Sequence, residues 1–573
     1  MFYGNMSERL KESVLKTVKL YLFREFKSLY FLMNFLIMKI IWIYTNFFKS
    51  TLVFLMFLKN INLEKIFLQN FYAEIYFIEF NWYFEFLPEI ALTFFILYNL
   101  ISIFNDLNRT FLQYYRWLFI YIIIFIIIFW KIFFFSNAQT EILLGFSWIN
   151  CFYTIFSKLI IITLTILVFW ISKNRLKNSL NLVCIVEFPL IISFSILFMF
   201  LLSSSYDLFG IYLSIEGLSL TLYVLAGILY KNILSIESSI KYFSLGAISS
   251  GFLLLGISII FGVIGSLDFL EVQIFLGSYQ LISHFFEIKI GFLFLLIGFL
   301  FKISAFPFHI WIVDVYEGIF SPITAFFAIV VKVCLILFFI RLTFNLMFNI
   351  IFFFQPVIIF SAIGSMISGS IGALKQVRIK RFIAYTSINQ VGFILLGISS
   401  CNFLGLIASI LYIILYSIMS IIFFTILLNT EHILKKKTMI YLSDLYHFSL
   451  YNNENSKFLI ITILSMGGIP PLAGFFGKLF LYFSIIESRL DILLFVTLII
   501  SILSSYYYLN FVRYILFEKY INHKLYYFIK QGKFNLILKM FSIFLLLFGL
   551  ILPNLFSVIT SISLSCAWPL IWY

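Results

Sequence analysis

Charged residues are scarce in this sequence. Only 11% of its 573 residues are Asp, Glu, Lys or Arg, and 63% are hydrophobic. An average soluble domain has about 25% charged residues, and the mean hydropathy of this chain is +1.08. These values exclude a water-soluble globular protein and indicate an integral membrane protein.

Cysteine is also rare, and the common cofactor motifs are missing. No G-x-G-x-x-G follows a predicted strand, and the GFFGK stretch lacks the glycine and the hydroxyl residue of a phosphate-binding loop. We therefore expect no metal and no cofactor in this chain, and any redox chemistry or ATP hydrolysis in another polypeptide. The cysteines are too scattered for a zinc or iron–sulfur site, at Cys151, Cys184, Cys334, Cys401 and Cys566.

Long hydrophobic runs fill most of the chain. A membrane-spanning helix needs about 20 apolar residues, and from Leu87 onward such runs follow one another closely. This pattern predicts an all-α, polytopic transmembrane bundle of about fourteen core helices. The predicted spans cover residues 87–104, 117–135, 147–171, 180–203, 207–230, 239–264, 288–312, 322–343, 351–371, 382–399, 403–428, 457–486, 490–516 and 535–560.

The N-terminal part differs from the rest. Residues 1–28 form a basic amphipathic segment that resembles a transit peptide, but Glu8, Glu12 and Glu25 are unusual in such a peptide. We therefore interpret residues 1–86 as a retained extension, with one possible extra helix and an interfacial segment. The division predicted is 1–86 for the extension and 87–573 for the helical core.

The net charge of +14 is spread over short loops. Lys and Arg gather in loops that follow odd-numbered spans, such as 173–177, 375–381 and 435–437, and the other loops carry Asp207 and Asp268. This asymmetry places the basic loops in the cytoplasm or the mitochondrial matrix, and it gives no reason to expect a nucleic-acid partner. The abundance of Phe, Ile, Asn and Lys is typical of AT-rich codons and favours an organelle genome.

Several ionisable residues lie inside the predicted spans. Glu216, Lys302, Lys332 and Lys478 are flanked by apolar residues on both sides. A charge there costs several kcal/mol unless a partner compensates it, and such residues usually mark an ion pathway. Lys241 lies only a few residues inside its span, so it could instead extend to the interface.

Two of these lysines lie beside predicted helix breaks. Pro307 follows Lys302 by five residues and leaves the carbonyl near residue 303 free for water or a polar side chain. Pro470 and Pro471 precede Lys478. The breaks fall in the seventh and twelfth spans, so the two broken helices run in opposite directions, as in an inverted repeat with a site at mid-membrane.

These groups predict a proton relay. Movement of Glu216 towards or away from a lysine would switch that lysine between holding and releasing a proton. His309 could bridge Lys302 and Lys332, or it could be a hydrogen-bonded structural residue. Asp314 and Glu317 are expected to cap the turn that follows and the next helix.

Five stretches carry a resemblance to a known family. They are YLSIEGLSLTLYVLAG, SSIKYFSLGAISSGFLLLGISIIFG, FKISAFPFHIWIVDVYEGIFSPITAFF, LKQVRIKRFIAYTSINQVGFILLG and LSMGGIPPLAGFFGKLFL. Together they resemble the antiporter-like membrane subunits of proton-pumping NADH:quinone oxidoreductase, respiratory complex I, and most closely the mitochondrial subunit 2 type. The N-terminal extension departs from the family pattern.

The resemblance implies a fourteen-helix subunit with two inverted five-helix repeats and broken seventh and twelfth helices. By this resemblance, Glu216 matches the glutamate of the fifth helix and Lys241 the lysine of the sixth. Lys302, Lys332 and Lys478 match the lysines of the seventh, eighth and twelfth helices.

The resemblance also implies a function. The chain would move protons from the matrix to the intermembrane space, in the mitochondrial inner membrane, coupled to NADH:ubiquinone oxidoreduction in other subunits. FMN, iron–sulfur clusters and ubiquinone would be bound by those subunits. The expected partners are neighbouring antiporter-like subunits of the membrane arm and lipids such as cardiolipin.

Two alternatives remain open. One is a subunit of a multisubunit Mrp-type cation/proton antiporter, which shares these helices and lysines but exchanges sodium. The other is a scaffold bundle that moves no ions. A scaffold would have its buried lysines paired in dry contacts, with no water beside Pro307 or Pro471.

Overall fold

The computed structural model describes most of the chain after residue 85. The described ranges are 86–105, 110–134, 141–143, 147–178, 182–277, 284–432, 440–445, 453–517, 526–528 and 532–567. Nearly all of the predicted N-terminal extension therefore lies outside the described residues, and its division from the core stays a prediction.

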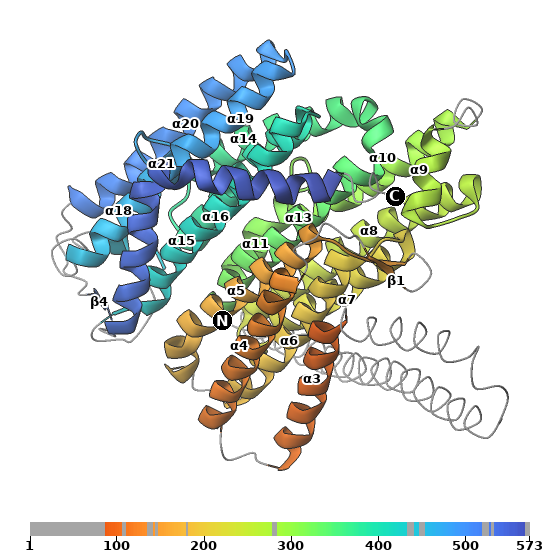
Figure 1. The fold of residues 1–573 in the computed structure, drawn as a ribbon. Helices are drawn as coiled ribbons and strands as arrows, with labels where there is room; N and C mark the ends of the chain where they lie inside the picture. Colours follow the sequence, from red (N-terminus) through yellow and green to blue (C-terminus); the bar gives the residue numbers. More distant parts are fainter. Residues whose placement is uncertain are drawn as a thin grey trace, which may run out of the picture. The chain divides into compact units, whose positions relative to one another are not determined.

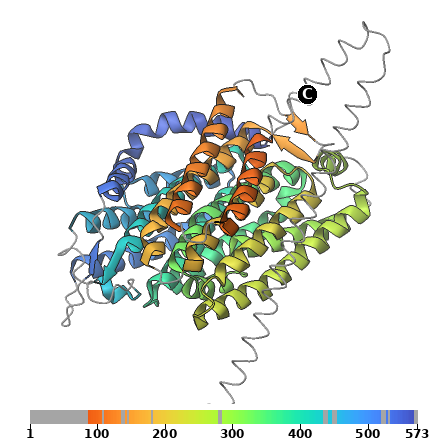
Figure 2. The same ribbon diagram turned by 90° about the horizontal axis from the view of Figure 1, so that it is seen from below.

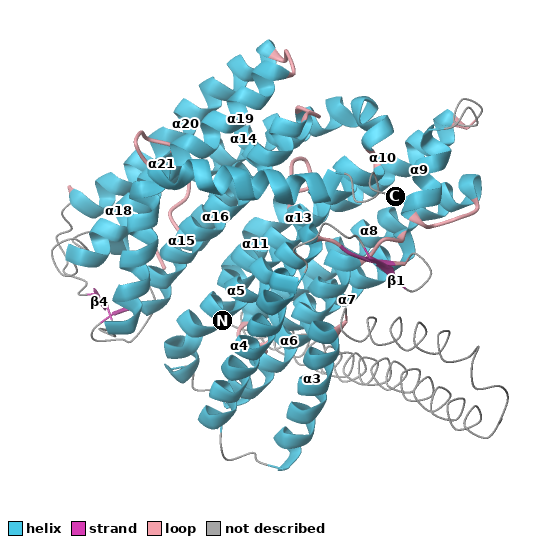
Figure 3. Cartoon of the chain, in the orientation of Figure 1, coloured by secondary structure: helices cyan, strands magenta, loops and turns pink. Residues whose placement is uncertain are grey.

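Helices dominate the described part, and two short antiparallel strand pairs accompany them (Figure 3). The first group of helices is α3 (Leu87–Asn105), α4 (Thr110–Phe134), α5 (Phe152–Asn178), α6 (Leu182–Ser204), α7 (Leu208–Ala226), α8 (Ile233–Ile264), α9 (Phe269–Gly277), α10 (Phe285–Ile303) and α11 (Ile310–Gly318). The second group is α12 (Ser321–Phe326), α13 (Lys332–Arg341), α14 (Ile351–Leu374), α15 (Ile379–Ser399), α16 (Phe403–Asn429), α18 (Asn453–Gly467), α19 (Ala473–Glu487), α20 (Asp491–Leu516) and α21 (Gly532–Ala567). One pair joins β1 (Glu141–Leu143) to β2 (Trp148–Asn150), and the other joins β3 (Thr430–His432) to the distant strand β4 (Tyr526–Phe528).

These helices confirm the predicted fold class. In the described part, nine helices are long and apolar enough to cross a membrane. The predicted spans 288–312 and 457–486 are each divided into two shorter helices, α10 with α11 and α18 with α19. The two strand pairs and the short helix α9 were not predicted, because a segment of three to nine residues shows too little periodicity to be identified as a strand or a helix.

The helix that contains Lys332 is the most deeply enclosed. Residues Ser321–Leu346 form a continuous helical stretch, in which α12 and α13 are joined by the π-helix η2 (Phe327–Val331), and its apolar window is 100% buried. Figures 1 and 2 show α3–α10 on one side of the bundle, called here the first set, and α14–α21 on the other, called the second set. Helix α13 packs against α5, α6 and α10 of the first set and against α16 of the second. Lys332 therefore lies between the two sets of helices.

The first helix break follows Lys302 directly. Helix α10 ends at Ile303, and Ser304 takes a left-handed conformation with φ of 66°. The Ser304 hydroxyl donates to the Ile303 carbonyl, and the Trp311 indole Nε1 donates to the Phe301 carbonyl at 3.1 Å. The carbonyl that was predicted to be free for a polar side chain is thus bound by one.

The second break lies between α18 and α19. Gly468 has φ of 82°, where a side chain is disfavoured, and Pro470 and Pro471 follow it. A Cβ atom at Gly468 would lie 2.8 Å from Cδ of Lys478. Glycine is therefore required here both by its backbone conformation and by the space that the lysine occupies.

This double requirement leads to a prediction. We expect Gly468→Ala to lower the stability of the folded chain by roughly 1–3 kcal/mol, since a non-glycine residue in a left-handed conformation is strained. Gly262→Ala is the matched control, because that glycine lies within α8 and has no atom within 4 Å of a built Cβ. Thermal denaturation in detergent would compare the two. Equal melting temperatures would contradict the prediction.

Candidate functional site

Lys302 and Glu216 lie close together in the first set of helices. Lys302, in the last turn of α10, is 8% exposed and interacts electrostatically with Glu216 of α7. The Ser219 hydroxyl donates to Glu216 Oε2 at 3.1 Å, whereas Oε1 is buried without a hydrogen-bond partner. Lys302 Nζ lies 6.0 Å from the centre of the Tyr223 ring. The structure thus brings together the carboxylate and the lysine that the sequence singled out.

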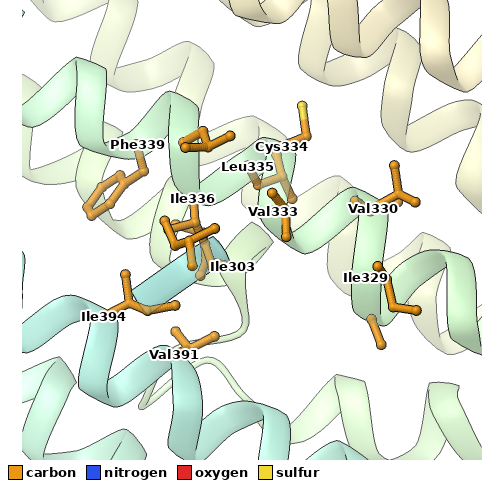
Figure 4. Close-up of a cluster of buried hydrophobic side chains, with 14 of the residues drawn as sticks. Ile303, Ile329, Val330, Val333, Cys334, Leu335, Ile336, Phe339, Val391 and Ile394 are labelled. Carbon is orange, nitrogen blue, oxygen red and sulfur yellow. The ribbon is translucent and has the colours of Figure 1, made fainter. Parts of the chain in front are cut away.

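Lys332 is bound by a hydroxyl group rather than by a carboxylate. It is 4% exposed, and its Nζ donates to Ser387 Oγ of α15 at 2.7 Å. The ring of Tyr316 lies 5.9 Å away. Figure 4 shows apolar side chains of α13, among them Val333 and Ile336, in a cluster with Ile303 of α10 and Ile394 of α15. A proton that reaches Lys332 must therefore travel through the few polar groups in contact with it.

Lys478 binds to the end of a broken helix. Its Nζ donates to the Gly467 carbonyl at 2.8 Å, where α18 ends and the carbonyl has no intrahelical donor. The side chain is 4% exposed, and its Nζ lies 4.5 Å from the centre of the Phe393 ring. The break in the helix thus provides a polar ligand for this lysine.

A polar network lies between these two lysines. Gln390 of α15 donates from Nε2 to the Tyr508 hydroxyl at 3.0 Å and to the Met466 carbonyl at 3.4 Å. The Tyr412 hydroxyl donates to Gln390 Oε1. Gln390 follows Ser387 by one helical turn and contacts the residue before Gly467. The network therefore lies one helical turn from the hydroxyl that binds Lys332 and next to the carbonyl that binds Lys478.

A small cavity adjoins this network. Its volume is about 20 Å³, and most of its lining is apolar, including Phe382, Ile383, Phe423, Phe424 and Ile463. The polar side chains of Ser387, Gln390, Tyr416 and Tyr508 also line it, and such a volume is enough for about one water molecule bound to these groups. One water here would complete a chain of hydrogen-bonding groups between Lys332 and Lys478.

The sequence analysis missed Ser387, Gln390 and Tyr508. The signal was present, because polar residues interrupt otherwise apolar spans in SINQ and SSYYY. Single hydroxyl and amide groups are nevertheless common in buried helices, where they bond to the carbonyl three or four residues earlier. Only their contacts across helices distinguish these residues.

We expect Gln390→Leu to slow proton transfer between the two lysines by about tenfold, because the Tyr412 and Tyr508 hydroxyls would lose their shared partner. Proton uptake by reconstituted protein would measure the rate. Asn389→Leu is the comparison variant, since the adjacent Asn389 donates instead to Tyr507 at 2.9 Å. An unchanged rate in the Gln390 variant would exclude this route.

Lys241 lies apart from the other lysines. Its side chain is 43% exposed, and Nζ forms ion pairs with Glu237 at 2.8 Å and with Asp314 at 2.9 Å. Its exposure agrees with the interpretation that this lysine extends to the interface. The structure does not bring Lys241 into contact with Lys302.

The capping roles predicted for Asp314 and Glu317 are wrong. Both residues lie within α11, and the N-terminus of the following helix has no side-chain cap. Glu317 pairs instead with Arg378 and Arg381, and Asp314 pairs with Lys241. These ion pairs connect α11 to α8 and to the start of α15. The carboxylates of α11 thus pair with basic residues of other helices rather than with backbone N–H groups of the next helix.

His309 precedes α11 directly. Its ring stacks against Phe306, with centroids 5.5 Å apart, and its Nδ1 atom is buried without a partner among the described residues. Within the described part, His309 makes no hydrogen bond to Lys302 or to Lys332. A relay role for this histidine stays a prediction.

A dry ion pair provides a contrast to the central lysines. Lys158 of α5 lies 2.6 Å from Glu89 of α3, and both side chains are almost fully buried. Lys302, Lys332 and Lys478 form no salt bridge of this kind with a described carboxylate. The scaffold alternative predicted such pairing for all buried lysines, and these three lysines do not show it with any described carboxylate.

A family described as NADH:quinone oxidoreductase/Mrp antiporter, transmembrane, matches residues 205–504. Subunit N of NADH-quinone oxidoreductase from Pelagibacter ubique (strain HTCC1062) is 37% identical over 366 residues, which cover 64% of this chain and 75% of that protein. Subunit N 1 from Rhizobium meliloti (strain 1021) is 36% identical over 338 residues, covering 58% and 68%.

Solved structures show the same fold. A chain of respiratory complex I from Thermus thermophilus has a TM-score of 0.65 at 22% identity, covering 81% of this chain and 98% of that one. A chain of the Mrp complex from Dietzia sp. DQ12-45-1b has a TM-score of 0.71 at 17% identity, covering 84% and 98%.

Proposed function

Because the chain belongs to the NADH:quinone oxidoreductase/Mrp antiporter family of transmembrane proteins, we propose that it is a proton-translocating subunit of respiratory complex I. It is a multi-span integral membrane protein, similar to the antiporter-like membrane subunits of that complex. The observation that carries the proposal is a set of three buried lysines without a close carboxylate. Lys332 donates to a hydroxyl, Lys478 donates to a carbonyl, and Lys302 has no close acceptor among the described residues. Lysines held in this way can lose and regain a proton.

We propose a route for the proton that uses these contacts. A proton enters the first set of helices at Glu216 and Lys302 and reaches Lys332 at the centre. It passes the Ser387 hydroxyl, the cavity and the Gln390 network, and it leaves near Lys478. The interaction between Glu216 and Lys302 supports the first step, and the cavity supports the second.

The energy for this transport comes from other subunits. Movement of one charge against the membrane potential requires about 2.3 kcal/mol per 100 mV. We place FMN, iron–sulfur clusters and ubiquinone in partner subunits, and this chain among the antiporter-like subunits of the membrane arm, with cardiolipin-type lipids around them. Together they form an NADH:ubiquinone reductase in the mitochondrial inner membrane, with a chain of the subunit 2 type.

The proposal is tested by gentle solubilisation of the source membranes and a native gel stained for NADH dehydrogenase activity. Mass spectrometry should identify this chain in the active band, beside flavin and iron–sulfur subunits, and cell fractionation should place it in mitochondria. A band of hydrophobic chains without NADH activity would contradict the proposal.

A second candidate is a subunit of a cation/proton antiporter. The matched family and the fold are shared with the Mrp complex, which supports this possibility. The greater identity to NADH-quinone oxidoreductase subunits favours the first candidate. Sodium-dependent proton movement in vesicles without NADH would favour the antiporter.

A further inference from the structure

Another buried cation lies on the same helix as Lys332. Arg341 ends α13 and is 2% exposed, at the end of the bundle where α6 finishes and Asp207 and Asp268 lie. Its Nη1 donates to the Ser203 carbonyl at 2.6 Å, and its guanidinium lies 5.6 Å from the centre of the Tyr206 ring. The route described above does not use this residue.

No carboxylate of the described residues neutralises the charge of Arg341. Its Nη2 atom is buried without a hydrogen-bond partner, and it forms no salt bridge with any described carboxylate. A carboxylate of a neighbouring subunit or a lipid phosphate cannot reach a side chain that is enclosed by this chain itself. Unlike lysine, arginine stays protonated when it is buried. A permanent positive charge is therefore fixed at this end of α13.

This position matters because of its distance from Lys332. Nine residues of helix separate the two, which corresponds to about 13 Å. Across that distance, at an effective dielectric constant of about 20, a unit charge changes the occupancy of a site by another cation by about tenfold. A proton at Lys332 is thus repelled from the nearest end of its own helix.

We infer that Arg341 is an electrostatic barrier, which prevents protons at Lys332 from escaping through the Asp207 and Asp268 end of the first set of helices. This inference rests on the proposed function. Fixed arginines exclude protons and cations from water-conducting pores by the same physics. With this exit closed, the favourable path from Lys332 is the one through Ser387 and Gln390 towards Lys478.

The test uses the whole complex, reconstituted in liposomes with a pH-sensitive dye inside. Passive proton influx is measured without NADH under an imposed membrane potential, and NADH oxidation is measured with an uncoupler. We expect Arg341→Met to raise passive proton influx by about tenfold. Arg341→Lys keeps the positive charge and is expected to leave the membrane tight. Equal influx in the Met variant and in the unaltered complex would overturn the barrier.

A second pair of variants covers the case in which Arg341→Met prevents assembly. Tyr206→Glu replaces the ring that lies 5.6 Å from the guanidinium with a carboxylate and leaves Arg341 in place, and Tyr206→Gln is its neutral control. The Glu variant should leak protons and the Gln variant should not; a tight Glu variant would exclude the barrier. Retained pumping after Lys332→Met would instead contradict the proposed function, so the two failures can be distinguished.

Discussion

Lys332→Met is expected to lower the rate of proton pumping by roughly 100-fold, the smallest contribution usually lost when a positioned proton-transfer group is removed. Methionine fills a similar volume in the fully enclosed α13 stretch but can neither hold a proton nor donate to Ser387. Proton uptake per NADH oxidised, measured in proteoliposomes, would show the loss.

The matched control for this variant is Lys375→Met. Lys375 is an exposed lysine at the end of α14, so its loss removes the same charge from the chain without touching the buried groups. Pumping by the control should equal that of the unaltered complex. If the Lys332 variant assembled and pumped at the normal rate, the route through α13 would be wrong.

Glu89→Gln is expected to lower the stability of the chain by roughly 3–5 kcal/mol, because it leaves the Lys158 ammonium buried and without its counter-ion. The remaining neighbour of Lys158 Nζ, Asn150 Oδ1, lies 3.4 Å away and carries no charge. Thermal denaturation in detergent would report the change. No effect on the lysines of the proposed route is expected, since Glu89 and Lys158 pair with each other.

The double variant Glu89→Gln with Lys158→Met separates charge from packing. Replacement of a whole buried ion pair by uncharged groups is often neutral or stabilising. We therefore expect the double variant to recover most of the lost stability, as a double-mutant cycle would show. A double variant no more stable than Glu89→Gln would mean that the pair does not account for the loss.

The buried charges and the broken helices could be predicted from the sequence, and the contacts between them could not. Lys302, Lys332 and Lys478 stood out because each interrupts an apolar run, and the two breaks followed from proline and glycine. Their ligands did not stand out. Ser387 lies 55 residues from Lys332 along the chain, and its hydroxyl is one of many.

The difference between local sequence patterns and long-range contacts also explains why the roles of some acidic residues were predicted wrongly or missed. Asp314 and Glu317 were assigned to local caps because capping involves residues a few positions apart. In the folded chain, Glu317 pairs with Arg381, 64 positions away. The Glu89–Lys158 pair was overlooked because Glu89 lies near the start of its helix and resembles an ordinary N-terminal carboxylate.

The sequence by itself determined that this protein spans a membrane, where its long apolar helices run and break, and that Lys302, Lys332 and Lys478 interrupt apolar runs. These properties depend on the hydrophobicity and backbone chemistry of short segments, whose effects add along the chain. Only the tertiary structure decided that Glu89, Lys158 and Arg341 are buried as well, and which of the buried cations have no carboxylate partner among the described residues. Those outcomes depend on how each helix is rotated and packed against distant ones. A helix that is apolar on all faces gives no sign in its sequence of which face contacts which neighbour.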